Sequence, residues 1–176
     1  DSRLNATRVL SEAVLQAQHP PKIWFNAASA TIYRHAEDRP MDEFTGEIGS
    51  DFSMDVCKAW EKSFYDLTLP ATRKVILRMS ITMGINGGVY LRFKNLVRFG
   101  LGGKMGNGKQ MMSWIHVEDI ARAISFIIEK ENINGIINVT SPNPVSNATF
   151  MSAVRKAMFM PFGLPTPRWF LAFGAF

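Results

Sequence analysis

Hydroxyl groups cluster where a short apolar segment ends. Residues 22–29 read Lys-Ile-Trp-Phe-Asn-Ala-Ala-Ser, and Thr31 and Tyr33 follow closely. Such a run is typical of a strand buried on both faces of a parallel sheet, and ligands of these sheets bind beyond the carboxyl ends of the strands. Hydroxyls placed there can donate to a carbonyl or alkoxide oxygen during hydride or proton transfer. They can equally satisfy backbone groups at the strand end.

A thiol and a carboxylate lie one turn apart in a predicted helix. Cys57 and Glu61 are four residues apart and therefore share one helix face. A negative neighbour raises the pKa of a thiol, which opposes formation of the reactive thiolate. The three histidines, His19, His35 and His116, have no spacing that suits a metal ion or a Cys–His pair. We therefore expect a packed cysteine and no metal site.

Two further segments carry groups that could take part in chemistry. His116 could be an acid–base group, and it precedes Glu118 and Asp119 at the start of a predicted helix. Carboxylates favour the positive end of a helix dipole, so capping and packing also explain these residues. The glycines of residues 100–108 surround Lys104 and could cradle a phosphate. That stretch matches neither a P-loop nor the G-x-G-x-x-G fingerprint, and a mobile substrate-side loop explains it better.

Apolar periodicity places these residues in an alternation of helices and strands. The predicted elements are, in chain order, the helix 4–17, the strand 22–29, the helix 51–67, the strand 74–79, the helix 90–99, the short extended segment 112–116, the helix 118–130, the strand 135–140 and a helix from Ser146. This alternation predicts an α/β fold with a parallel sheet and helices on both faces. The polar residues 34–50 read as a long surface loop. Three strands are few for this architecture, so we expect an incomplete sheet.

Composition bounds the class of protein. The chain has 176 residues, of which 47% are apolar and 20% charged, and its formal net charge is +5. A single cysteine excludes an internal disulfide, and the apolar residues 169–176 are far fewer than the about 20 that a membrane-spanning helix needs. Basic residues are spread along the chain, which disfavours nucleic-acid binding. We expect a cytoplasmic protein with a small-molecule substrate, no nucleic-acid partner and no membrane partner.

Seven short segments form a set that runs in order through nearly the whole chain. They are 29–33 (Ser-Ala-Thr-Ile-Tyr), 55–61 (Asp-Val-Cys-Lys-Ala-Trp-Glu), 77–78 (Leu-Arg), 100–103 (Gly-Leu-Gly-Gly), 106–110 (Gly-Asn-Gly-Lys-Gln), 113–119 (Ser-Trp-Ile-His-Val-Glu-Asp) and 138–147 (Asn-Val-Thr-Ser-Pro-Asn-Pro-Val-Ser-Asn). Together they resemble the extended short-chain dehydrogenase/reductase superfamily of the NAD-dependent epimerase/dehydratase type. The match is most specific to its atypical epimerase-like branch, also called cell-division-inhibitor-like.

The resemblance implies a Rossmann-type fold and a larger protein around this chain. Residues 1–144 would form the C-terminal part of an NAD- or NADP-binding domain, and residues 145–176 would begin a helical substrate-side region or tail. The Gly-rich phosphate loop would lie upstream of Asp1. The N-terminal half of the sheet would then be missing from this chain, which we interpret as an internal piece of a longer protein.

The resemblance also implies roles for particular residues. Ser29 matches the catalytic hydroxyl that helps to hold the substrate oxygen. The strand end 27–29 would pass under the nicotinamide ring. Residues 79–81, at the end of the next strand, would border the ring's amide, largely through backbone groups. The implied cofactor-binding residues are Ala27, Ala28, Ser29, Met79, Ser80 and Ile81. Arg78 is as readily explained by a structural role.

One expected pair is absent. In the superfamily's Tyr-x-x-x-Lys, the tyrosine exchanges a proton and the lysine lowers its pKa, but alignment on Glu61 puts Ser53 and Cys57 at these positions. Tyr33 lies near the predicted site and is a candidate substitute acid. Two hypotheses follow: an NAD(P)-binding epimerase-like oxidoreductase of unknown substrate, or a catalytically silent nucleotide-sensing or regulatory protein. Surface association through the basic Gly-rich loop or the apolar residues 169–176 ranks third.

Overall fold

The computed structural model describes residues 2–85 and 87–166, and these divide into two compact units. Within the described ranges, the first unit contains residues 2–34, 40–80 and 118–139. The second unit contains residues 35–39, 81–117 and 140–166. The predicted apolar segment 169–176 lies outside the described residues. The division at residues 144 and 145 stays a prediction.

A parallel sheet forms the centre of the first unit. Its strands are β1 (Ile23–Ser29), β2 (Arg73–Met79) and β7 (Gly135–Val139), in the order β1-β2-β7. In the register, Ser29 is the partner of Met79, and Met79 is the partner of Val139. The three strands therefore end at one edge, which confirms the predicted parallel sheet and places the predicted site residues Ser29 and Met79 side by side.

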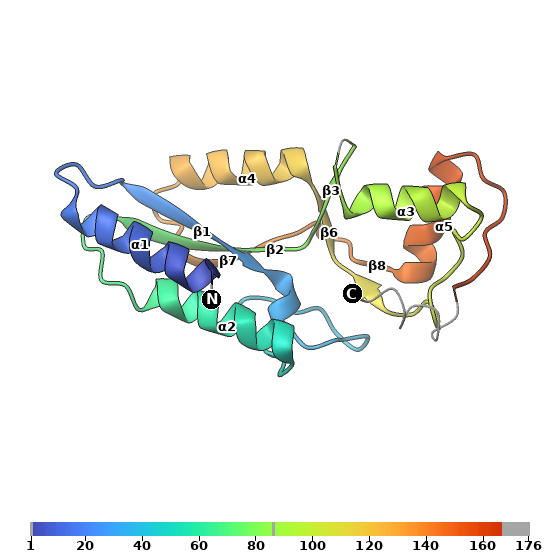
Figure 1. Cartoon of the computed structure of the whole chain (residues 1–176), viewed down its shortest axis with the longest axis horizontal. Coiled ribbons are helices and arrows are strands. Elements are labelled where there is room, and N and C mark those ends of the chain that lie inside the picture. Colours follow the sequence, from blue (N-terminus) through green and yellow to red (C-terminus); the bar gives the residue numbers. More distant parts are fainter. Residues whose placement is uncertain (1, 86, 167–176) are drawn as a thin grey trace. The chain divides into compact units, whose positions relative to one another are not determined.

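Helices cover both faces of this sheet, as predicted. They are α1 (Ser2–Gln16), α2 (Phe52–Tyr65) and α4 (Val117–Glu129), and Figure 1 shows α4 on one face and α1 and α2 on the other. The carboxylate of Asp51 accepts the N–H of Met54 and so caps the start of α2. Phe64 near the end of α2 is fully buried against Ala28 and Ile76 of the sheet.

The predicted surface loop 34–50 folds back on the end of β1. A short 3-10 helix, η1 (Ala30–Ile32), follows β1, and Tyr33 then forms an antiparallel bridge with Ile48. A Cβ on Gly46 would lie 2.5 Å from the ring atom Cε1 of Tyr33, so only glycine permits this close approach. The loop therefore packs on Tyr33 at the carboxyl edge of the sheet.

The second unit contains short strands and two helices around an apolar core. Its elements are β3 (Ile81–Gly84), β4 (Gly87–Gly88), α3 (Val89–Arg98), β5 (Met111–Met112), β6 (Trp114–His116), β8 (Val145–Ser146) and α5 (Asn147–Ala157). β4, β3 and β6 form one sheet in that order, and β5 pairs with β8. The predicted extended segment 112–116 is thus split between two sheets. Val97, Met151 and Val154 are the buried centre of the core between α3 and α5.

Candidate functional site

Ser29 lies at the junction of β1 and η1. Its Oγ accepts a hydrogen bond from the N–H of Thr31 at 3.3 Å and contacts the Thr31 hydroxyl. The side chain therefore caps a turn, as the structural interpretation of the hydroxyl cluster predicts. Ser29 is nevertheless half-buried and Thr31 is exposed, so both hydroxyls remain accessible to a ligand at the sheet edge.

Among the predicted cofactor residues of the first unit, Ala27 provides an open surface next to Ser29, whereas Ala28 and Ser80 are buried. Ala28 is buried on the face that α2 covers, whereas Ala27 is exposed on the opposite face. On β2, Met79 is half-buried; the N–H of Ser80 and its Oγ both donate to the carbonyl of Val139, at 3.2 and 3.4 Å. The sixth residue, Ile81, begins β3 in the second unit.

These residues fit the nicotinamide end of a dinucleotide. An exposed alanine leaves room for a flat ring over the strand, and two accessible hydroxyls adjoin it at the strand end. Ser80 contributes backbone structure, because both of its donors are already bonded. The sequence contains no G-x-G-x-x-G motif, so these residues do not include the Gly-rich loop that binds a pyrophosphate.

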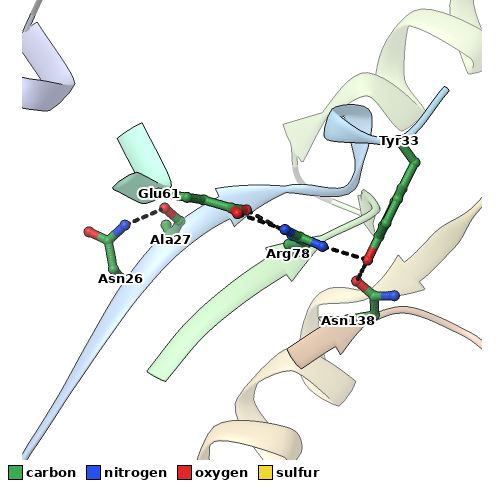
Figure 2. A network of polar contacts seen from close by, with 6 residues as sticks. All are labelled: Asn26, Ala27, Tyr33, Glu61, Arg78 and Asn138. Atoms are coloured by element: carbon green, nitrogen blue, oxygen red, sulfur yellow. Dashed lines mark hydrogen bonds and ion pairs between the residues drawn. The ribbon is translucent and has the colours of Figure 1, made fainter. Parts of the chain in front are cut away.

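Four polar side chains form a buried network beside this surface, as Figure 2 shows. Arg78 of β2 makes a bidentate ion pair with Glu61 of α2, with N–O distances of 2.8 and 2.7 Å. Its third contact is a 2.8 Å hydrogen bond to the hydroxyl of Tyr33, which in turn donates to Oδ1 of Asn138 at 2.9 Å. The network joins α2, the end of β1, β2 and β7.

The charges of this network compensate one another. Arg78 is 5% exposed and Glu61 is 7% exposed, so neither is solvated by bulk water. Burial by itself would lower the pKa of Arg78, but its hydrogen bonds to Glu61 and Tyr33 outweigh burial and raise that pKa above its ordinary value. The guanidinium therefore stays charged and is held in one orientation by Glu61.

Tyr33, the predicted substitute acid, lies directly after η1 and belongs to this network. Its side chain is 8% exposed, and its ring lies against the Arg78 guanidinium, 5.0 Å from carbon to ring centroid. The hydroxyl uses its proton for Asn138 and a lone pair for Arg78. The signal that could have revealed this network is a charged residue within the apolar strand 73–79, because a buried charge needs a partner.

A cavity of ≈ 440 Å³ opens in the first unit beside α2. Ile32, Ile76 and Ile136 supply much of its apolar wall, and the Arg78–Glu61 pair also borders it. The predicted cofactor residues do not line it. The cavity and the hydroxyl-bearing strand end are therefore separate features of this unit.

Comparison with known proteins decides the family. Residues 71–140 match the model of the NAD dependent epimerase/dehydratase family. An epimerase family protein of Mycobacterium leprae is 36% identical over 95% of this chain and 53% of its own length. The crystal structure of human epimerase family protein SDR39U1 (isoform 2) with NADPH has a TM-score of 0.87 at 30% identity, over 94% of this chain and 56% of that one. The chain belongs to the NAD-dependent epimerase/dehydratase family.

One more relative and one more solved structure support the same fold. The YfhF protein of Bacillus subtilis is 32% identical over 97% of this chain and 56% of its own length. MoeE5 in complex with UDP-glucose and NAD is similar in fold, with a TM-score of 0.74 at 21% identity. The fold is the Rossmann-like epimerase fold that the motifs imply. The chain spans about half the length of the curated relatives it matches.

In this epimerase family member, the positions that the resemblance assigns to the Tyr-x-x-x-Lys pair lie on α2 and are Ser53 and Cys57. Ser53 is exposed on α2, and Cys57 is buried one turn later. Burial raises the pKa of the Cys57 thiol; a hydrogen bond with Thr31 lowers it and the Glu61 carboxylate raises it again, with a net rise. The cysteine is packed, as predicted. Neither position supplies a phenol or an ammonium group.

The remaining candidates have structural contacts. Glu118 and Asp119 lie in the first turn of α4, and both accept hydrogen bonds from Arg122, at 3.2 and 2.6 Å. Their place in the first turn suits the helix dipole, and their side-chain partner is Arg122. In the Gly-rich stretch, Oδ1 of Asn147 at the start of α5 accepts the N–H of Met105 at 2.8 Å. Among the residues that the structure describes, no group of three or more His, Cys, Asp or Glu side chains is placed to hold a metal ion.

Proposed function

We propose that the protein is a cytoplasmic, NAD(P)-binding, epimerase-like oxidoreductase that acts on a small-molecule substrate, with NADPH as its cofactor. The observation that carries this proposal is the strand-end hydroxyl of Ser29 beside the open surface of Ala27, at the shared carboxyl edge of three parallel strands. The likeness to an NADPH-bound human relative supports the choice of cofactor.

Each side chain in this proposal has a defined task. NADPH, when bound, supplies a hydride for a substrate carbonyl. Ala27 provides the surface under its nicotinamide ring and Ala28 contributes through its backbone, while the backbone from Met79 to Ile81 borders the ring's amide. The Ser29 hydroxyl donates to the substrate oxygen and stabilises the negative charge that develops there.

For Tyr33 we propose a positioning role. Its hydroxyl is bonded to Arg78 and Asn138, so proton donation to a substrate would first require the Asn138 hydrogen bond to break. Tyr33 lies directly after η1 and is fixed by this network, while Ser29 caps the other end of η1. The network thus holds the turn that presents the Ser29 and Thr31 hydroxyls.

Hydride transfer from NADPH to a panel of small carbonyl compounds and 4-keto nucleotide sugars tests the proposal. The natural protein that carries this sequence is expected to oxidise NADPH with at least one of them. Ser29→Ala should lower that rate by roughly 10²-fold or more, as expected for loss of an oxyanion donor. Ser63→Ala removes a hydroxyl that bonds only to the Trp60 carbonyl and is the matched control. An unchanged rate in Ser29→Ala would contradict the catalytic assignment.

A second candidate function is a nucleotide-sensing or regulatory protein that binds NADPH without turnover. It is favoured by the exposed Ser53 and the buried, protonated Cys57 at the positions of the absent Tyr and Lys. Saturable NADPH binding without oxidation by any member of the panel would support this candidate. Hydride transfer that depends on Ser29 would exclude it.

A further inference from the structure

Acidic residues are absent from two long segments of the chain. Residues 81–117 and 140–176 contain eight Lys and Arg residues and no Asp or Glu, although the whole chain has 15 acidic residues. Apart from residues 35–39, the described parts of these segments make up the second unit. The second unit is therefore strongly basic, whereas the first contains more acidic than basic residues.

The two helices of this basic unit end side by side. The N–H of Leu164, after α5, donates to the carbonyl of Gly100, after α3, at 2.8 Å, and the N–H of Gly103 donates to the Leu164 carbonyl at 3.0 Å. Figure 1 shows the two chain segments together at the ends of α3 and α5. The joined segments carry four exposed apolar side chains, which we name the aromatic end: Phe99 (78% exposed), Phe159 (93%), Phe162 (71%) and Leu164 (61%).

Phe159 is unusual in its backbone as well as in its exposure. Its φ of 56° lies in the left-handed region, which glycine adopts without strain and a bulky residue does not. The N–H of Met160 bonds to the carbonyl of Arg155, and the N–H of Phe159 bonds to that of Lys156, so α5 ends in a Schellman motif with phenylalanine at the usual glycine position. Helix termination does not require phenylalanine there, so the exposed ring calls for another explanation.

Exposed cations flank the aromatic end. Arg98 precedes Phe99, and Lys156 lies in the last turn of α5; both are exposed, and neither forms an ion pair with any described residue. Cations in a last turn also favour the helix dipole, but that effect does not account for the adjacent rings. Exposed apolar groups mark interaction surfaces, and a surface that adds cations without any carboxylate complements a negatively charged partner.

We propose that the aromatic end, with Arg98 and Lys156, docks the protein on an anionic lipid surface. Aromatic and aliphatic side chains enter the boundary between headgroups and acyl chains, while Lys and Arg remain with the anionic headgroups. None of the four apolar side chains has a polar atom with which to contact a base edge, which disfavours readout of a DNA duplex through its grooves. This proposal replaces the sequence-based expectation of no membrane partner, and it requires no membrane-spanning helix. Within the described ranges, no helix has the length and apolarity to cross a bilayer.

Flotation of the natural protein with vesicles tests this proposal. Phosphatidylcholine vesicles with about a third phosphatidylglycerol should carry the protein at low salt, whereas pure phosphatidylcholine vesicles should not, because the attraction is partly electrostatic. The double variant Phe159→Gly/Phe162→Ser should bind roughly tenfold or more weakly, since it removes two large apolar side chains. Glycine suits the backbone at 159, so this variant should fold.

Matched variants distinguish binding through the aromatic end from nonspecific adsorption through any exposed apolar or basic side chain. Phe44→Gly/Phe52→Ser removes two rings of similar exposure, 95% and 84%, from the first unit and should leave flotation unchanged. Arg98→Gln/Lys156→Gln should weaken binding roughly thirtyfold, and Lys22→Gln/Lys130→Gln, in the first unit, should not. NADPH affinity should be the same in all variants, so this test is independent of the proposed function.

Three outcomes would overturn the proposal. The first is failure of the natural protein to float with the anionic vesicles at low salt. The second is equal loss of flotation in the two double phenylalanine variants. The third is binding to a DNA duplex that exceeds binding to the vesicles and that persists in Phe159→Gly/Phe162→Ser, which would identify nucleic acid as the partner of the basic unit.

Discussion

Arg78 is a charged residue in the middle strand of a sheet, and its partners determine what it contributes. The bidentate contact with Glu61 and the hydrogen bond to Tyr33 satisfy its guanidinium inside the first unit. Replacing such a pair by apolar residues is often neutral for stability, whereas removing one partner leaves an uncompensated charge. The pair is therefore best tested one partner at a time.

Glu61→Gln is expected to lower the free energy of unfolding by about 3–5 kcal/mol, because Arg78 then stays charged without a buried carboxylate. Urea unfolding followed by circular dichroism measures the loss. Lys62→Gln breaks the exposed pair with Asp66 on the same helix and should change little. Equal stability of Glu61→Gln and Lys62→Gln would show that the ion pair does not stabilise the fold.

Tyr33→Phe removes one hydroxyl that links Arg78 to Asn138. We expect the free energy of unfolding to fall by about 1–3 kcal/mol, because buried polar groups lose their partner. Tyr65→Phe is the control: Tyr65 is 63% exposed, so loss of its hydroxyl should leave the free energy of unfolding unchanged. If Tyr33→Phe kept full stability but abolished hydride transfer, the hydroxyl would act as an acid and the positioning role would be wrong.

The ionisation of Cys57 makes the free energy of unfolding depend on pH. Its pKa is raised in the folded state, chiefly by burial, so the folded protein holds the thiol proton more tightly than the unfolded chain does. The resulting stabilisation is complete below the pKa of the unfolded thiol, about 8.5, and is lost as pH rises through the folded value. The natural protein should therefore lose more stability between neutral and alkaline pH than Cys57→Val does. Parallel pH profiles from urea titrations of both proteins would contradict this expectation.

At the scale of elements, local sequence patterns predicted most helices and strands. The strand predicted at 22–29 is Ile23–Ser29, and the helix predicted at 118–130 is Val117–Glu129. The helix has strong apolar periodicity and the strand is a nearly continuous apolar run, so both patterns are visible in the local sequence. Of the candidate site, the sequence predicted the parts that depend on neighbouring residues, such as Ser29 at the end of a strand.

Contacts between distant residues were not predictable in the same way. The backbone N–H of Asn138 donates to the carboxylate of Glu43, and Tyr33 bonds to the side chain of Asn138 more than a hundred residues away. No spacing pattern in one sequence encodes such pairs. The loop 34–50 therefore reads as a free surface loop in the sequence, although its Glu43 accepts a backbone hydrogen bond from β7.

The start of α2 offers a test at this scale. Asp51→Ala removes the side chain that accepts the N–H of Met54, and it should lower the free energy of unfolding by about 1 kcal/mol. Asp51→Asn retains an N-cap acceptor and should keep most of that stability. Chemical denaturation of the three proteins measures the difference. A loss in Asp51→Asn equal to that in Asp51→Ala would assign the effect to charge instead of capping.

At the scale of the whole molecule, chemistry and charge are divided between the units. The first unit carries the strand-end hydroxyls and the buried network, whereas residues 81–117 and 140–166 of the second contain Lys and Arg and no Asp or Glu. This division explains why an overall charge of +5 was a poor guide to partners: it averages a basic unit with an acidic one. The count of charges was known from the sequence, but their segregation on one unit required the fold.

Calorimetric titration of the natural protein with NADPH tests the central claim most directly. Saturable binding is expected, and Ala27→Leu should weaken it by roughly tenfold, because the larger side chain fills the open surface over β1 where the nicotinamide ring would lie. Ala59→Leu, at an exposed alanine of α2, should bind NADPH as the natural protein does. Absence of binding to both NADPH and NADH at millimolar concentration, or equal affinity of Ala27→Leu and the natural protein, would contradict the account.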